Sequence, residues 1–344
     1  MTGPLYAVLP GDIDDPAAPS GGNTYDRRVL TGLAATRAVH EIAVAGPWPY
    51  PGPEQARELT AALQSLPGGA TVLMDGLVAG AVPEIVEAQA ARLRQVVLVH
   101  LPLGDETGAA PELPERERRA LHAAHAVVAT SEGAARRIEA LHGLSPGTVH
   151  VAPPGVDRAP LAEGSADGRR LLCVAAVTPR KAQDVLVDAL VRLEDLPWEC
   201  VCAGALDRDP AYAARVTARS DRVRFVGART GAALEATYAA ADLLVLPSRA
   251  ETYGMVVTEA LARGIPVLGT RVEGVPEAVG RAPDGAVPGG LLPPGDVESL
   301  ATALRRWLTD PGLRAAWRTA ARARRDTLRG WDETTRRLSE VVDR

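Results

Sequence analysis

The sequence predicts an α/β fold with two doubly wound parallel-sheet domains. Short apolar runs alternate with amphipathic segments along nearly the whole chain, which is the pattern of parallel strands joined by crossover helices. The alternation is interrupted once, at residues 158–170, by a polar segment containing Gly, Pro and Ala. A chain of 344 residues is also long enough for two domains of ordinary size.

The first alternation predicts a domain over residues 1–157. Apolar runs mark its strands, and segments of helical period mark its helices. The expected strands are Leu5–Leu9, Ile42–Ala45, Thr71–Met74, Val96–Val99, Ala126–Thr130 and Val149–Ala152. The expected helices are Tyr25–Ala38, Glu54–Leu66, Pro83–Leu93, Leu113–His122 and Ser131–Leu141.

The second alternation predicts a domain over residues 171–328, with residues 158–170 as the linker between the two. Its expected strands are Leu171–Val174, Trp198–Cys202, Val223–Val226, Leu243–Leu246 and Val267–Leu268. A break at Gly330 separates this domain from a final helix, Asp332–Val342, in the segment 329–344.

The segment from Pro247 to Pro266 predicts a loop and a helix arranged to bind an anion. The loop follows a buried strand, and the helix should begin near Gly254 and end at Gly264. The free backbone N–H groups of Gly254, Met255 and Val256 would point out of the helix start. Together with the helix dipole, these groups favour an anion such as a diphosphate.

Two carboxylates flank this helix start. Glu251 lies in the loop, as does Tyr253, which we also expect to bind the donor, and Glu259 lies just over one turn inside the helix. Each carboxylate can reach beyond one end of a diphosphate, so a sugar on one side and a ribose on the other would fit. Either glutamate alone is better interpreted as a solvated surface charge, but strand, loop, glycine and helix together favour nucleotide-sugar binding.

At these residues the chain resembles the retaining glycosyltransferases of family four, which have the GT-B fold. The shared pattern is a Glu, seven residues and a second Glu, here Glu251 and Glu259, and the similarity continues through Gly274–Glu277 and Gly290–Asp296. It covers the C-terminal half well and the N-terminal half more thinly. The resemblance implies two domains facing each other across a cleft, with residues 1–157 on the acceptor side and residues 171–328 binding the nucleotide sugar. It also implies that the final helix crosses back onto the first domain.

The resemblance implies that Lys181 and a nearby Arg neutralise the diphosphate leaving group. Lys181 matches the family's Lys, but the position of the usual Arg is occupied by Ala176. Arg180 is the expected substitute, and the alternative is that it is a solvated loop residue. Preplaced cations are the groups best able to stabilise charge that develops on a leaving diphosphate. In this interpretation the catalytic residues are His100, Lys181, Arg180 and Glu251.

Three further positions follow from the resemblance. His100, at the end of a predicted strand, would contact the donor sugar. Gly21 and Gly22 would bring backbone N–H groups to a phosphate, and the alternative is a turn with Asn23 or Thr24 as the helix cap. The main chain of Val226 and Gly227 would face the nucleobase.

An acidic stretch follows the first predicted strand. Asp12, Asp14 and Asp15 resemble the metal-binding Asp-x-Asp of another transferase class, but family four needs no metal, and we expect neither a metal nor another cofactor. Contact with the acceptor, to which Asp105 would also contribute, and a plain acidic loop are both open interpretations.

Charge and composition restrict the ligands. Residues 1–157 have a net charge of −7 and the remainder has +2, so a nucleotide diphosphate fits the second half and nucleic acid is excluded as a partner. The acidic first half favours a polar or cationic small acceptor, although solubility alone would explain it. The 38 basic residues include a single Lys, Lys181, which suggests a specific need for an ammonium group. The three cysteines lie in predicted strands, so we expect them to pack in the core as reduced thiols.

The resemblance implies transfer of a sugar from a nucleotide diphosphate donor, expected to be a UDP- or GDP-sugar, to a small polar acceptor, with retention at the anomeric carbon. Alternatives are a nucleotide-sugar epimerase or hydrolase of the same fold, a non-catalytic nucleotide-sugar sensor, and an NAD-type oxidoreductase. No G-x-G-x-x-G follows a predicted strand, which argues against the last. No apolar run is long enough to span a membrane, and we expect a cytoplasmic protein without stable membrane insertion. The sequence leaves the oligomeric state unknown.

Overall fold

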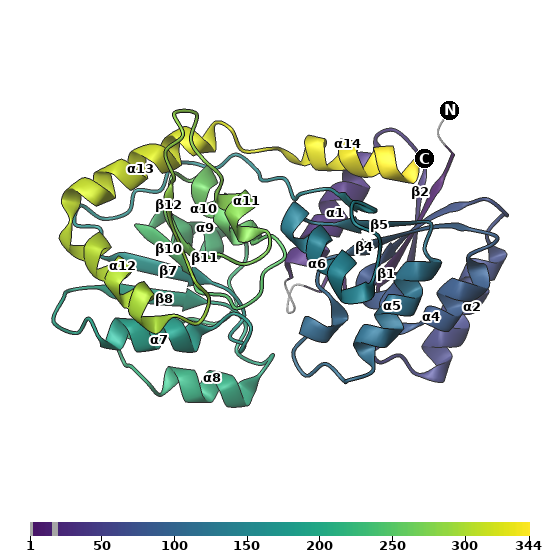
Figure 1. The fold of residues 1–344 in the computed structure, drawn as a ribbon, viewed down its shortest axis with the longest axis horizontal. Helices are drawn as coiled ribbons and strands as arrows, with labels where there is room; N and C mark the ends of the chain where they lie inside the picture. The colour runs from purple at the N-terminus through teal and green to yellow at the C-terminus, as the bar shows by residue number, and fades with distance from the viewer. Residues whose placement is uncertain (1–2, 16–19) are drawn as a thin grey trace. The chain divides into compact units, whose positions relative to one another are not determined.

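The computed structural model describes residues 3–15 and 20–344, which form two compact units (Figure 1). The first unit contains the chain up to Gly155 together with Gly330–Arg344, and the second contains Val156–Arg329. Each unit is built on one six-stranded sheet in which neighbouring strands are parallel. The predicted pair of doubly wound parallel sheets is therefore confirmed.

The strands of the first unit are β1 (Leu5–Pro10), β2 (Val39–Val44), β3 (Thr71–Asp75), β4 (Arg94–Val99), β5 (Ala126–Ala129) and β6 (Val149–Val151). Its helices are α1 (Gly21–Ala34), α2 (Pro53–Ser65), α3 (Gly76–Ala81), α4 (Pro83–Gln89), α5 (Leu113–Ala123), α6 (Glu132–His142) and α14 (Trp331–Val342), with a 3-10 turn, η1, at Leu103–Asp105. The strand order is β2-β1-β3-β4-β5-β6.

Alternate residues of each strand in the first unit enter two different cores. On β1, Leu5, Ala7 and Leu9 pack with α1 and α14, whereas Val8 packs with the helices of the opposite face. That opposite face is covered by α2 to α6. Because both faces of the sheet are covered, its strands are almost continuously apolar, as parallel strands usually are.

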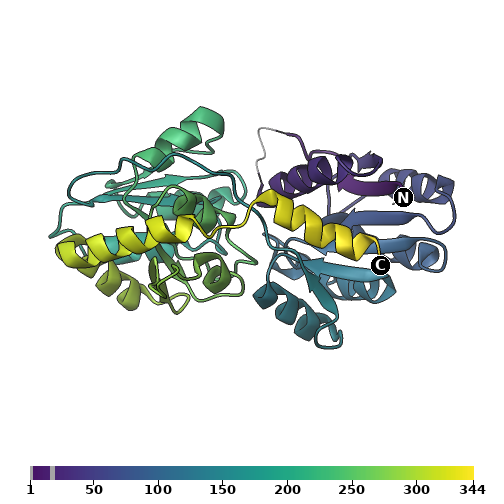
Figure 2. The ribbon, with the colours of Figure 1, turned by 90° about the horizontal axis from the view of Figure 1, so that it is seen from above.

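The last helix belongs to the first unit, although the whole second unit separates it from the rest in sequence. In Figure 2, α14 lies beside α1. The Arg37 guanidinium donates to the Asp343 carboxylate at 2.7 Å, and the Thr334 hydroxyl donates to the Pro153 carbonyl at 2.8 Å. Leu338 is fully buried in the core shared with α1.

The strands of the second unit are β7 (Arg170–Val174), β8 (Glu199–Ala203), β9 (Val223–Phe225), β10 (Leu243–Leu246), β11 (Val267–Thr270) and β12 (Gly289–Leu292). Its helices are α7 (Gln183–Val191), α8 (Pro210–Thr217), α9 (Gly231–Ala239), α10 (Met255–Ala262), α11 (Val275–Val279), α12 (Val297–Thr309) and α13 (Pro311–Arg325). The strand order is β12-β11-β10-β7-β8-β9, which is the Rossmann order. Helices α7, α8 and α12 cover one face, and α9, α10, α11 and part of α13 cover the other.

Residues 158–170, which the sequence analysis interprets as a linker, lie along the second unit. The reason is a set of hydrogen bonds to buried groups of that unit. Asp242, 2% exposed, accepts from the backbone N–H of Ser165 at 2.7 Å and of Arg170 at 2.9 Å. The backbone N–H of Ala162 donates to the Arg263 carbonyl at 2.9 Å.

The start of one helix and the presence of another in the first unit differ from prediction. Helix α1 begins at Gly21 instead of Tyr25, because the Ser20 side chain accepts from the Asn23 N–H and caps the helix there. Helix α3 was not predicted. It forms because the Asp75 carboxylate accepts from the Leu77 N–H at 2.6 Å and caps a short segment that includes two glycines.

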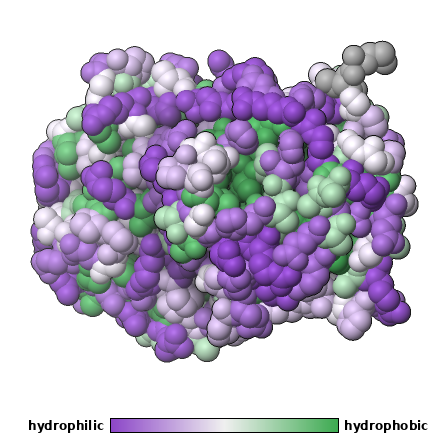
Figure 3. Space-filling model, turned by 45° about the vertical axis from the view of Figure 1, so that its right-hand side comes forward, coloured by the Kyte–Doolittle hydropathy of each residue, from purple (hydrophilic) through white to green (hydrophobic). Residues whose placement is uncertain are grey.

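Hydrophilic residues cover most of the face drawn in Figure 3, with hydrophobic residues interspersed among them. Among the described residues, no helix combines the length and the apolar composition that crossing a bilayer requires. The three cysteines are buried and unbridged, Cys173 on β7 and the other two on β8.

Candidate functional site

The two sheets each have a switch point, where consecutive connections leave in opposite directions along the sheet. In the second unit it lies between β7 and β10, and in the first between β1 and β3. Ligands of open α/β sheets bind beyond the carboxyl ends of the strands at such points. Lys181 and Glu251 lie in the loops after β7 and β10, and Gly21 and Gly22 begin the helix that follows β1.

An ion pair links the two loops at the switch point of the second unit. Nζ of Lys181, in the loop after β7, contacts Oε2 of Glu251, in the loop after β10, and their side chains are only 17% and 10% exposed. Burial lowers the pKa of Lys181 below its ordinary value, although the Glu251 charge opposes this. Burial acts to raise the pKa of Glu251, but the charges of Lys181 and Arg180 outweigh it and keep that pKa below its usual range.

Arg180 ties the same two loops together through the backbone. Its guanidinium donates to the Ala250 carbonyl at 3.3 Å, and its own carbonyl accepts from the Arg249 N–H at 2.8 Å. Ala176, where the family pattern has an Arg, supplies a carbonyl that accepts from the Gln183 amide at 2.9 Å. Arg180 and Lys181 thus place two cations close to Glu251.

Strained backbone lies on both sides of this pair. In the described part of the chain, Ala182 (φ +57°) and Glu273 (φ +25°) are the non-glycine residues with positive φ. Ala182 directly follows Lys181, and the Glu273 carboxylate accepts from the Glu251 N–H at 2.6 Å. The Gly274 N–H also donates to the Glu251 carbonyl at 3.3 Å. Such strain persists where surrounding contacts hold it in place, and it often occurs at functional sites.

Helix α10 begins beside Glu251, as predicted. Gly254 takes the position before the helix with φ +85°, and no side chain caps the first turn. The N–H groups of Met255 and Val256 therefore lie at an uncapped helix start, which favours an anion. Tyr253 is buried there, and burial, with the nearby charge of Glu277, raises its pKa to about 12.

Glu259 is held by a tyrosine that the sequence analysis did not identify. The Tyr238 hydroxyl donates to Oε2 of Glu259 at 2.7 Å, and the Arg263 guanidinium lies 4.6 Å from the centre of the Tyr238 ring. Arg263 also donates to the Glu259 carbonyl at 2.8 Å and pairs with Glu235. Burial raises the pKa of Glu259, while Tyr238 and Arg263 oppose this rise. One carboxylate oxygen is thus fixed by the protein.

Val226 and Gly227 follow β9 at the same edge of the sheet. The Val226 N–H donates to the Cys202 carbonyl at 3.0 Å, and the Gly227 carbonyl accepts from the Gly204 N–H at 2.9 Å. These two main-chain groups therefore bond to β8 and the residue after it.

In the first unit, Gly21 and Gly22 form the first turn of α1. Because Ser20 is the cap, the alternative caps Asn23 and Thr24 are wrong. A Cβ atom on Gly22 would lie 3.2 Å from Cδ2 of His100, so the glycine permits close approach of the helix start to this ring.

His100 directly follows β4 and lies in a buried cluster with two aspartates, Asp26 of α1 and Asp75 at the end of β3. His100 Nε2 is 2.7 Å from Asp26 Oδ1, and one ligand atom from each of the three residues lies within 4.8 Å of the others. Burial acts to lower the pKa of His100, but Asp26, helped by Asp75, raises it to about 9. Burial and the Asp26 charge raise the pKa of Asp75 to about 7.

Of the four acidic residues considered for the acceptor side, two are paired with arginines. Asp14 is paired with Arg27 at 2.6 Å, and Asp105 is held by Arg137 at 2.7 Å. Asp12 and Asp15 are exposed in a turn.

Sequence reasoning missed Asp26, Asp75, Tyr238 and Glu273. Asp75 could have been identified as a candidate site residue, because it lies at the end of an apolar strand, at the carboxyl edge of the sheet. The other three lie within helical or loop patterns that give a carboxylate or a tyrosine no special meaning.

Comparison with known proteins identifies related chains for both units. The family model "Glycosyltransferase Family 4" matches residues 17–159, and "Glycosyl transferases group 1" matches residues 168–310. A D-inositol 3-phosphate glycosyltransferase of Kineococcus radiotolerans is 34% identical over 271 residues, which are 69% of this chain and 62% of the relative. The corresponding protein of Streptosporangium roseum is 34% identical over 65% of this chain and 56% of the relative. The matched part thus spans about three fifths of these curated relatives.

Solved structures match over nearly the whole chain. Sucrose-phosphate synthase from Thermosynechococcus elongatus has a TM-score of 0.77 at 21% identity, covering 99% of this chain and 98% of that one. HepE of Anabaena, solved with UDP-glucose, has a TM-score of 0.76 at 18% identity, covering 98% and 99%. At these identities the likeness concerns the fold.

Proposed function

The chain belongs to family 4 of the glycosyltransferases, the glycosyl transferases of group 1, and on this premise we propose that it transfers a sugar from a nucleotide diphosphate donor to a small polar acceptor. The observation that carries the proposal is the Lys181–Glu251 ion pair at the switch point of the second unit, beside the uncapped start of α10. A nucleotide sugar supplies both partners that these groups need, a diphosphate for the cations and hydroxyls for the carboxylate.

In the proposed reaction, Lys181, Arg180 and the N–H groups at the start of α10 stabilise negative charge on the departing diphosphate. Cations and dipoles that are already in place stabilise such charge without reorganisation, and this lowers the barrier by several kcal/mol in comparable sites. When the diphosphate attracts Lys181, Glu251 is released to accept hydrogen bonds from the donor sugar. Glu273 keeps the Glu251 backbone fixed during this exchange.

Glu259 would bind the ribose. Tyr238 occupies Oε2, so a ribose hydroxyl pair would be accepted mainly by Oε1. The acceptor proton would go to a phosphate oxygen of the donor on the face from which the diphosphate leaves, which gives retention and needs neither a separate base nor a metal. His100 of the first unit would contact the donor sugar.

For the donor we propose a UDP-sugar first and a GDP-sugar second, since the HepE structure was solved with UDP-glucose. The named D-inositol 3-phosphate transferases suggest polyol acceptors for the first assay, although the chain matches only part of their length. An acceptor without phosphate fits the acidic first unit better, because its net charge is −7 over residues 1–157.

A thermal-shift screen with UDP-, GDP-, ADP- and TDP-sugars tests donor binding. At least one should raise the melting temperature, and a flat response to all nucleotides and nucleotide sugars would contradict the proposal. Glu259→Ala should weaken donor binding, whereas Lys181→Ala should mainly lower turnover. Wild-type kinetics in both variants would refute the site. Turnover of donor without any acceptor would favour the epimerase or hydrolase alternative.

A further inference from the structure

The cluster around His100 contains one acidic group more than the histidine can balance. Asp26 and Asp75 are 4% and 6% exposed, and the His100 side chain is 17% exposed. Two ionised carboxylates beside one imidazolium would leave a net negative charge in a buried place, which is costly. A proton on one of the two carboxyl groups would remove this charge.

The hydrogen bonds of the cluster also leave room for one more proton. Oδ1 of Asp26 is bonded to His100 Nε2, but Oδ2 is buried and has no donor among the described residues. Oδ1 of Asp75 accepts from the Leu77 N–H. A carboxyl group at Asp75 that keeps its proton can donate it to Asp26, and a contact of this kind between the two side chains contributes to the raised pKa of Asp75.

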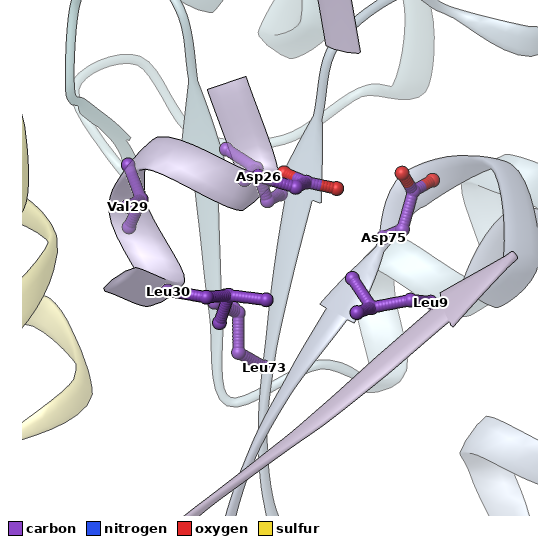
Figure 4. A pocket seen from close by; sticks show the side chains of 7 residues that line it. Leu9, Asp26, Val29, Leu30, Leu73 and Asp75 are labelled. Atoms are coloured by element: carbon purple, nitrogen blue, oxygen red, sulfur yellow. The ribbon is translucent and has the colours of Figure 1, made fainter. Parts of the chain in front are cut away.

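Among the described residues, the charges that shift the pKa of His100 are those of Asp26 and Asp75. Figure 4 shows the carboxyl group of Asp26 directed toward that of Asp75, with Leu9, Leu30 and Leu73 lining the cavity beside them. Tyr25 of α1 is a further titratable neighbour of the histidine, and its ring stands edge-on at 5.1 Å while its hydroxyl donates to the Ala152 carbonyl. Burial raises the pKa of this tyrosine further, so it stays neutral.

We propose that Asp26 is a positioning residue for His100, and that Asp26 and Asp75 hold one proton between them opposite a His100 that remains an imidazolium at neutral pH. The aspartate pair then has a single negative charge, and the cluster as a whole is neutral. His100 presents its site with a fixed positive charge and a ring held by the Nε2 contact. The raised pKa of His100, about 9, agrees with this assignment.

The ionisation state can be tested without any donor or acceptor, so its outcome is independent of the proposed function. In the full chain with isotope-labelled histidine, NMR should show a His100 ring that stays protonated beyond pH 8, assigned by its loss in His100→Gln. Asp26→Asn should bring the midpoint to about 6.5 or below, the ordinary value for His. Asp75→Asn, which imitates the protonated acid, should leave His100 charged at pH 7.5. Glu115→Gln, an exposed carboxylate of the same unit, is the matched control and should change nothing.

A wild-type His100 that titrates near 6.5 would overturn the proposal, and this measurement needs no variant to fold. A melting temperature raised by Mn²⁺ or Zn²⁺ in wild type but not in Asp26→Asn would also overturn it, since a cation would then balance the charge.

The consequence for activity rests on the proposed function and is measured separately. At pH 7.5 Asp26→Asn should lose activity, and the deficit relative to wild type should shrink by about tenfold at pH 6, where an ordinary histidine becomes charged again. A purely structural role of Asp26 would give a deficit that does not change with pH, and that result would refute the positioning role. If no donor is found at all, the NMR titration still decides the ionisation proposal.

Discussion

Replacing Lys181 by Met should destabilise the second unit and make its stability depend on Glu251. The substitution leaves a carboxylate that is 10% exposed without its principal partner. Breaking a buried pair in this way costs about 3–5 kcal/mol, and because Arg180 remains nearby we expect a smaller loss, about 2–3 kcal/mol. For a unit of this size, that loss corresponds to a fall in melting temperature of about 4–12 °C.

The double variant Lys181→Met with Glu251→Gln should regain most of this loss, because a neutral amide has no buried charge to compensate. Urea unfolding of the wild type, both single variants and the double variant at pH 7.5 gives the coupling free energy, which we expect to be about 2 kcal/mol. Arg192→Met is the matched control. It breaks an exposed pair with Glu298, 51% and 79% exposed, and should cost less than about 1 kcal/mol. Additive effects of Lys181 and Glu251, with coupling below about 0.5 kcal/mol, would refute the reasoning.

Three other predictions concern the residues around this pair and the histidine. Tyr238→Phe removes the hydroxyl that fixes Glu259, so in steady-state kinetics KM for the donor should rise several-fold with little change in kcat, and an unchanged KM would contradict this role. In urea unfolding, Glu273→Gly should be more stable than Glu273→Ala by about 1 kcal/mol, because glycine adopts a positive φ without steric cost, and equal stability would rule out strain. The pKa of His100 is higher in the folded protein than in the unfolded chain, so the charged histidine stabilises the fold. Its contribution to the free energy of unfolding, about 3 kcal/mol, is complete below pH 6.5 and is lost as the pH rises through 9. Urea unfolding from pH 6 to pH 9.5 should show this decline in wild type and a much flatter curve in Asp26→Asn.

The sequence predicts those site residues whose place beside a strand end or a helix start is visible in the local sequence. Glu251 and Gly254 follow an apolar strand and precede a helix, so the edge of a parallel sheet could be assigned to them directly. Lys181 stood out because it is the only lysine. The predicted strands correspond closely to the observed ones for the same reason, since buried parallel strands form short apolar runs.

The remaining residues depend on contacts between distant segments, which a local pattern does not contain. Asp26 lies in a helix beside two arginines, where an acidic residue is normally solvated, and only the fold of the first unit brings it to His100. Tyr238 and Glu259 are 21 residues apart, on two helices of the same face. Glu273 combines a positive φ with a hydrogen bond to the Glu251 backbone, and neither can be predicted from residue type.

Because the sequence contains a single lysine, the proposed site can be labelled selectively at Lys181. Reagents that acylate primary amines find only the α-amino group and the Lys181 side chain, since the other 37 basic residues are arginines. Lys181 is held in a largely buried ion pair, so its modification rate reports how often the Lys181–Glu251 contact opens. Mass spectrometry of the acylated peptides therefore measures the extent of acylation at Lys181. A ligand that binds beside Lys181 should lower this extent.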